Sequence, residues 1–136
     1  DTAEEDTLLA TLLAAALRHA ESVLGQVLLR RSGSERLAAG TSWQRLGATP
    51  VQAIVAVAAI DAAGVSTALP ASAYSLDIDA RGDGWVRVTA PGEARHVVVT
   101  LEAGIAAAFG DVPEPLRLAV LRMAAHLHRH RDAAED

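Results

Sequence analysis

The segment from Val112 to Arg131 constrains the fold most, because it reads as a helix with two apolar faces. Prolines at 113 and 115 fit a first helical turn, where the amide hydrogens have no intrahelical acceptor. At about 100° per residue, one stripe contains Leu116, Val120, Met123 and Leu127, and the opposite stripe contains Leu118, Leu121 and Ala125. One stripe can pack against the chain's own core, so the other predicts more core or a partner.

A long N-terminal helix is predicted over about residues 3–24. Thr2 and Glu5 have the spacing of a capping box, and Gly25 is a natural stop. Its packed face is predicted to consist of Leu9, Leu13, Ala16, Leu17, Ala20 and Leu24, which recur at helical spacing. Because the chain begins at Asp1 without methionine, we expect a further short segment to precede it.

The region from about 27 to 101 predicts short strands. A possible strand over 27–31 is followed by turns at 32–34 and 40–42, and further strands are expected over 51–60, 73–78, 85–89 and 96–101. The run from Val51 to Ile60 is apolar on both alternating faces, which predicts a strand buried on both sides. Residues 104–109 suggest a helical turn before the last helix, which we expect over about 113–131.

These elements predict an α+β fold in which two helices pack over one face of a small antiparallel sheet. The 136 residues suffice for a single domain, with residues 132–136 as a frayed tail. Half of the residues are apolar but only 3% are aromatic, so the core must be assembled from many small contacts. Assembly with further copies would supply additional buried area.

Composition excludes several classes of function. The absence of cysteine removes disulfides and thiolate chemistry, and the absence of lysine removes a P-loop and a Schiff base. A net charge of −5 argues against a dedicated DNA-binding surface. Charges at Arg18, His19 and Glu21 interrupt the leucine-rich stretch before it reaches the roughly 18 apolar residues of a membrane span.

Candidate chemistry is sparse. His126 and His130 share a helix face but lack a third metal ligand and an HExxH context, so a polar helix end is the better interpretation. The acidic segment from Asp77 to Asp83 lacks the final glutamate of a calcium loop and predicts a hairpin tip. No serine has a GxSxG setting. We therefore predict no enzyme activity, no catalytic residue, no metal and no cofactor.

Two further groups of residues are candidates for functional roles. Glu21 and Glu102 read as lone carboxylates without a partner. Trp43 and Trp85 are predicted to pack in the core or in an interface, because too few basic residues flank them for nucleic-acid stacking.

The chain resembles the head-tail connector, or adaptor, family of long-tailed phages and gene transfer agents. The residues that carry this resemblance are VPEPLR and AAHLHRHRD in the last helix, AYSLD at residues 73–77, and EAG at residues 102–104. The resemblance runs from about Asp6 to Asp132 and is sharpest over Val112 to Asp132. It implies a structural protein of a virion or phage-like particle, assembled in the bacterial cytoplasm.

The resemblance also implies partners. These are the portal protein, a head-closure or tail protein, and further copies of the chain in a ring of about twelve, as in the family, through which DNA passes without specific binding. In this family the C-terminal helix contacts the portal, so residues off the core stripe are expected to face the portal or a neighbouring subunit: Leu118, Leu121, Arg122, Ala125, His128, Arg129 and Arg131. The alternatives are a head-closure or tail-terminator ring protein, which we expect to be richer in β structure, and a small partner-binding module or antitoxin-like regulator. A metal-dependent enzyme is the remotest alternative.

Overall fold

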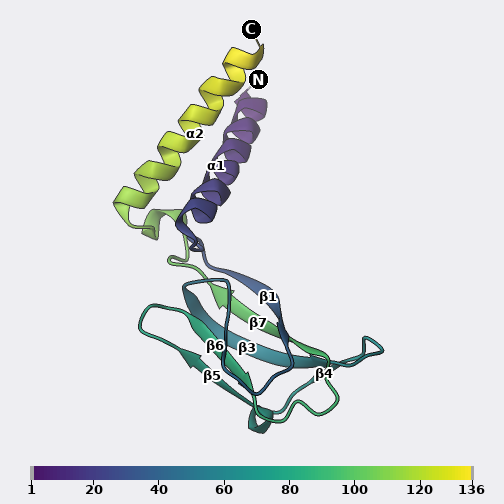
Figure 1. The fold of residues 1–136 in the computed structure, drawn as a ribbon. Helices are drawn as coiled ribbons and strands as arrows, with labels where there is room; N and C mark the ends of the chain where they lie inside the picture. The colour runs from purple at the N-terminus through teal and green to yellow at the C-terminus, as the bar shows by residue number, and fades with distance from the viewer. Residues whose placement is uncertain (1, 136) are drawn as a thin grey trace.

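The computed structural model describes residues 2–135, and it describes side-chain exposure for residues 2–131. A helical hairpin stands at one end, and two small antiparallel sheets stand at the other (Figure 1). The hairpin consists of α1 (Thr2–Leu24) and α2 (Glu114–Glu135), with the short 3-10 helix η2 (Phe109–Asp111) before α2. The predicted α+β class is confirmed.

The two sheets contain all seven strands of the described chain. The four-stranded sheet has the order β1-β7-β3-β4, from β1 (Arg31–Ala38), β7 (His96–Ala103), β3 (Val51–Ile60) and β4 (Ser66–Ala68). The three-stranded sheet has the order β2-β6-β5, from β2 (Gln44–Arg45), β6 (Gly84–Val88) and β5 (Tyr74–Ile78). The short 3-10 helix η1 (Ala71–Ala73) leads into β5.

The inner faces of the two sheets form the first core. Strand β7 carries its buried residues at every second position, from Val97 to Ala103, because successive side chains of a strand point to opposite faces. Val86 and Val88 of β6 and Leu46 pack against them from the other sheet. The outward residues of β7, including His96 and Val98, therefore lie on the open face of the four-stranded sheet.

A second core lies within the helical hairpin. Ala16 of α1, Val120 of α2 and Leu28 of the connecting segment are fully buried there. Leu13 and Leu17 pack against them from α1, as Leu116, Met123 and Leu127 do from α2. The predicted core stripe of the last helix is thus confirmed, whereas Leu9 and Leu24 of α1 are exposed rather than packed.

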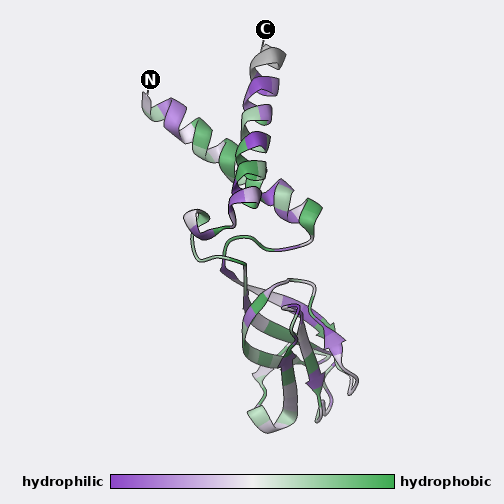
Figure 2. Cartoon of the chain, turned by 90° about the vertical axis from the view of Figure 1, so that its left-hand side faces the viewer, coloured by the Kyte–Doolittle hydropathy of each residue, from purple (hydrophilic) through white to green (hydrophobic). Residues whose placement is uncertain are grey.

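Three predictions about packing are wrong. The helices pack on each other and project away from the sheets instead of covering a sheet face (Figures 1 and 2). Strand β3 is not buried on both sides, since Val55 is 60% exposed. Residues 32–34 lie within β1 rather than in a turn, because β1 pairs with β7 along its whole length and its small residues fit that ladder.

A narrow junction joins the hairpin to the sheets. The Glu21 carboxylate is only 8% exposed. It accepts a hydrogen bond from the Leu28 amide at 2.7 Å and forms an ion pair with Arg31 at 2.9 Å. Arg30 pairs with Glu102 at 2.7 Å. The interpretation of Glu21 and Glu102 as lone carboxylates is therefore wrong, because their partners lie on segments that only the fold brings near.

Gly104 explains the EAG motif at this junction. Its φ of +141° is a conformation that residues with a side chain rarely adopt. A Cβ atom at this position would lie 2.4 Å from the Arg30 Cα. A glycine therefore allows the two crossing segments to touch.

Helix α1 has the length and apolar composition of a membrane-spanning helix, contrary to the expectation from its charges. Core helices of globular proteins and signal sequences share this property. Here Leu13, Ala16 and Leu17 pack against α2. The prediction of no membrane partner stays a prediction, as do the boundaries of a single domain. The predicted frayed tail falls on residues whose side chains lie outside the description, although the α2 backbone is helical to Glu135.

Replacing Glu21 tests the junction. We expect Glu21→Ala to lower the free energy of unfolding by about 2–4 kcal/mol, because the buried Leu28 amide loses its acceptor and Arg31 loses its partner. Glu21→Gln keeps a hydrogen-bond acceptor, so its loss of unfolding free energy should be clearly smaller than that of Glu21→Ala. Urea unfolding measures both, with Glu93→Ala on an exposed loop as the control. An unchanged midpoint for Glu21→Ala would show that the junction does not depend on this carboxylate.

Candidate functional site

The outer face of α2 is the candidate site. Its members are those that the sequence placed off the core stripe. Leu118 and Leu121 are 43% and 47% exposed, and Arg122, Ala125, Arg129 and Arg131 are exposed with them. Val120, one residue before Leu121, is fully buried against α1, so the helix wheel separates the two faces sharply.

His128 is placed differently from the other candidates. It is half-buried and lines a hollow of about 260 Å³ together with Glu5, Leu8 and Leu9 of α1. The structure thus groups six of the seven predicted residues on the exposed part of α2 and sets His128 between the two helices. A side chain at the margin of an apolar stripe can pack against the partner helix or face solvent, depending on where that helix lies.

Further exposed apolar residues lie on α1. Leu9 is 53% exposed, Val23 is 72% exposed and Leu24 is 44% exposed. Figure 2 shows hydrophobic residues recurring along both helices where they stand clear of the sheets. The sequence assigned Leu9 and Leu24 to a packed face, because their helical spacing does not reveal how far the partner helix extends. The hairpin therefore exposes more apolar surface than the sequence predicted. Exposed apolar surface of this kind is typical of a region that binds a partner.

The charges of this face come from α2. Arg122 and Arg129 form no ion pair or hydrogen bond with any residue in the described part of the chain, whereas Arg117 donates to the Gly110 carbonyl at 2.7 Å and secures the start of the helix. An apolar stripe bordered by unpaired guanidinium groups suits a partner with an apolar patch and nearby carboxylates.

Helix α2 shows no metal site within residues 2–135. The rings of His126 and His130 stack with centroids 6.0 Å apart, and no group of three histidine, aspartate or glutamate side chains in that range could hold an ion. These two rings lie on one helix face, as their spacing predicts.

The acidic segment of residues 77–83 is a hairpin tip. Asp79 Oδ1 accepts the amides of Arg81 and Asp83 at 2.9 and 3.0 Å, and Asp79 Oδ2 accepts the Trp85 indole N–H at 3.0 Å. All of these oxygens serve the turn, and Gly82 there has a φ of +87°. Trp85 is thus held on the outer face of its sheet rather than in a core, and Trp43 is largely exposed.

Two comparisons found no match: no family model and no curated protein matches the chain. Solved structures do. The chain is 27% identical to a protein in the neck of an empty gene transfer agent particle computed with C6 symmetry, with a TM-score of 0.77, covering 95% of this chain and 69% of that one. A protein in the neck of a native particle, computed with C12 symmetry, is 28% identical with a TM-score of 0.75, covering 92% and 73% of the respective chains. A third, from the virion of a native gene transfer agent particle, is 28% identical with a TM-score of 0.72, covering 92% and 67%.

The tip of the β5–β6 hairpin predicts a pH effect. The Trp85 hydrogen bond and the two turn amides hold the pKa of Asp79 below its usual 3.8. A lowered pKa means that the ionised Asp79 carboxylate stabilises the fold at neutral pH. This stabilisation is lost as the pH falls below the usual pKa of the carboxyl group. Asp79→Asn should therefore be less stable than wild type at about pH 7, with the difference shrinking below about pH 4. Urea unfolding over this range checks it. The control is Asp77→Asn, because Asp77 makes no side-chain hydrogen bond within the described chain; an Asp79→Asn deficit independent of pH would contradict the assignment.

Because they lie on different faces of α2, substitutions at the adjacent residues Val120 and Leu121 should differ in their effect on the free energy of unfolding. Val120→Ala should lower the free energy of unfolding by about 1–3 kcal/mol, since it opens a cavity in the hairpin core. Leu121→Ala should change it by less than about 0.5 kcal/mol, because the side chain contributes little to the isolated fold. Thermal or urea unfolding of the two variants measures this. Equal losses would mean that Leu121 belongs to the core and not to a free surface.

Proposed function

We propose that this chain, a member of the head-tail connector family of phages and gene transfer agents, is an adaptor that joins the capsid portal to the tail machinery. The chain is a structural neck protein by its likeness to gene transfer agent neck proteins. The adaptor role is the finer assignment. The observation that carries it is the uncovered face of α2 at the far end of an elongated molecule, with its apolar stripe and with Arg122 and Arg129, which have no partner among the described residues.

Ring formation with further copies is the second element of the proposal. The similar neck structures were computed with C6 and C12 symmetry, which suits a ring of twelve subunits. A ring multiplies small contacts, so even about 1–2 kcal/mol at each shared interface yields an assembly that rarely dissociates. A chain poor in aromatics, with apolar residues left exposed on α1 and α2, suits that mode of stabilisation.

The portal is the proposed partner of the hairpin, and a head-closure or tail protein is the proposed partner of the opposite end. Leu118, Leu121 and Ala125 would fill an apolar patch, while Arg122, Arg129 and Arg131 would meet carboxylates at its border. His128, which lies between the helices, would support this face from behind. In this proposal the particle assembles in the bacterial cytoplasm and the chain stays in the finished particle.

DNA would pass through the lumen of the ring without being bound specifically. The chain carries a net charge of −5, and an anionic lumen repels phosphate and lets the duplex slide. Salt-sensitive tight binding of purified protein to duplex DNA would contradict this part of the proposal. No catalytic role is proposed.

The rival assignment, a head-closure or tail-terminator ring protein, was expected to be richer in β structure. Two long helices of 23 and 22 residues, forming a core of their own, favour the adaptor.

Combined replacement of Leu121→Asp and Arg129→Glu tests the docking face. We expect at least about a tenfold drop in particles that carry tails and retain nuclease-protected DNA, because the change places charge in the apolar stripe and reverses its border. Electron microscopy counts tailed particles, and nuclease protection measures retained DNA. The matched control is Arg87→Glu, which reverses an exposed charge on the outer face of the three-stranded sheet. Normal tail attachment by a stably folded double variant would refute the assignment.

A further inference from the structure

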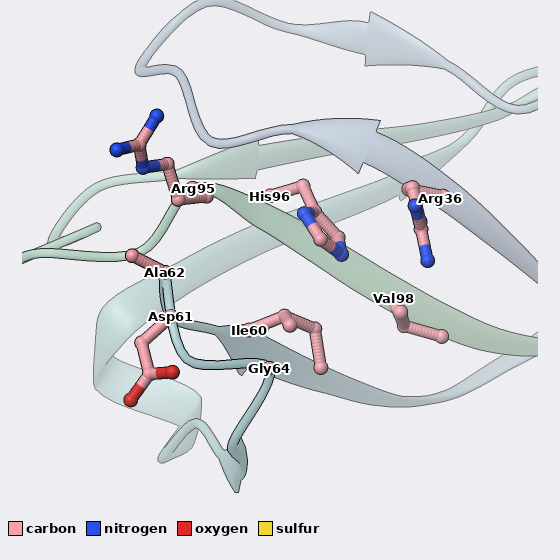
Figure 3. Close-up of a pocket in the computed structure, with 8 residues that line it drawn as sticks. All are labelled: Arg36, Ile60, Asp61, Ala62, Gly64, Arg95, His96 and Val98. Carbon is pink, nitrogen blue, oxygen red and sulfur yellow. The ribbon is translucent and has the colours of Figure 1, made fainter.

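A cleft of about 640 Å³ opens on the outer face of the four-stranded sheet, away from the three-stranded sheet. It lies where β1 and β7 meet the turn between β3 and β4 (Figure 3). Its basic groups are Arg36 of β1 and Arg95 and His96 at the start of β7, and Asp61 lies at its margin. We call this the basic cleft. None of these residues belongs to the hairpin face discussed above.

The strand register brings these residues together from distant parts of the sequence. Val98 of β7 pairs with Arg36 of β1 on one side, and His96 pairs with Ile60 of β3 on the other. Because alternate residues of β7 fill the inner core, His96 and Val98 must face outward. Figure 3 shows the His96 ring between Arg36 and the backbone of Arg95, whose guanidinium group points away from the ring, with Ile60 and Val98 below it.

The basic groups of the cleft have no acceptors within the described chain. Arg36 and Arg95 form neither a side-chain hydrogen bond nor an ion pair with any residue of the described range, whereas Arg30 and Arg31 are both paired. His96 Nε2 is buried and has no hydrogen-bond partner there. A buried imidazole nitrogen without a partner costs free energy, so a ligand that forms a hydrogen bond with it would recover that cost.

Asp61 does not supply that group. Its Oδ1 accepts the backbone amides of Ala63 and Val65 at 2.9 and 3.0 Å, which commits it to the β3–β4 turn. The cleft therefore presents two guanidinium groups and one imidazole against one committed carboxylate. Counting the two guanidinium groups and the carboxylate, its net charge is one positive unit.

This charge balance selects the class of ligand. One carboxylate neutralises the cleft, and the aliphatic part of a glutamate fits a floor of Ile60 and Val98. Duplex DNA needs many spread cations for comparable affinity, and Asp61 together with the chain's net charge of −5 opposes it. The cleft thus favours an acidic protein segment over a nucleic acid.

We propose that the basic cleft binds glutamate or aspartate side chains of an acidic segment, presented by a protein that packs against the sheet end of the molecule. A carboxylate in the cleft would accept a hydrogen bond from the His96 Nε2–H group and form an ion pair with the Arg36 or the Arg95 guanidinium group. That the protein is a particle component on the side away from the portal rests on the proposed function; the binding chemistry does not.

Titration of the purified chain with an oligoglutamate peptide tests the proposal, with the histidine ring signals followed by NMR. We expect saturable shifts of the His96 ring but not of His19, His126 or His130. Arg36→Ala combined with Arg95→Ala should weaken binding at least about tenfold, since both charged donors are lost. Arg45→Ala combined with Arg87→Ala removes the same charge from the other sheet and should leave the affinity unchanged.

Two outcomes would overturn the proposal. The first is no shift of His96 at millimolar peptide, or equal weakening by both double variants, which would reflect net charge alone. The second is tighter binding of short duplex DNA at the same signals, which would assign the cleft to phosphate. The Leu121→Asp, Arg129→Glu variant should bind the peptide normally, so failure of the hairpin assignment and failure of this one are distinguishable.

Discussion

The carboxylate of Glu21 is the interaction on which the arrangement of the molecule depends. Hairpin and sheets have separate cores and share little packed surface, so their relation is determined at the narrow junction between them. There a buried carboxylate on the last turns of α1 holds the Leu28 amide, which positions Leu28 at the base of the hairpin core, and Arg31, the first residue of β1. One side chain thus ties the end of a helix to the start of a strand. Burial of a carboxylate is expensive without such partners, and here both are supplied.

Separation of the two cores leaves each end of the molecule free to specialise. The hairpin exposes apolar residues and arginines on α2, and the sheets expose a cleft with two arginines and a histidine. The proposed adaptor would hold unlike neighbours at its two ends, and two independent surfaces on one short chain would meet that need. The small contacts within each core suit a protein whose stability is completed by neighbours.

Local pattern predicted the elements of this fold well, and long-range placement poorly. The helical spacing of Leu116, Val120 and Met123 correctly identified the residues of α2 that pack in the hairpin core. The same spacing could not say that the two helices bury each other rather than a sheet, because an amphipathic stripe carries no information about its partner.

The same limit applied to the sites. Glu102 and Arg30 are 72 residues apart, and Arg36 and His96 line the same cleft only because β1 pairs with β7, so neither cluster has a local signal. The outer stripe of α2 was predictable because all its members lie on one helix. Its extension onto α1, at Leu9 and Val23, was not.

The junction also has a mechanical consequence. The two connecting segments run side by side over residues 27–30 and 105–106, where backbone hydrogen bonds join Arg30 to Ala106, Ala106 to Leu28, and Ile105 to Val27. A two-stranded ribbon of this kind resists stretching and bending within its plane, but it yields to bending across it, as a leaf spring does. We expect the hairpin to swing in one direction while the sheets stay in place. In the proposed ring, the same movement in every subunit would change the diameter of the opening. The contacts between the sheets would stay intact.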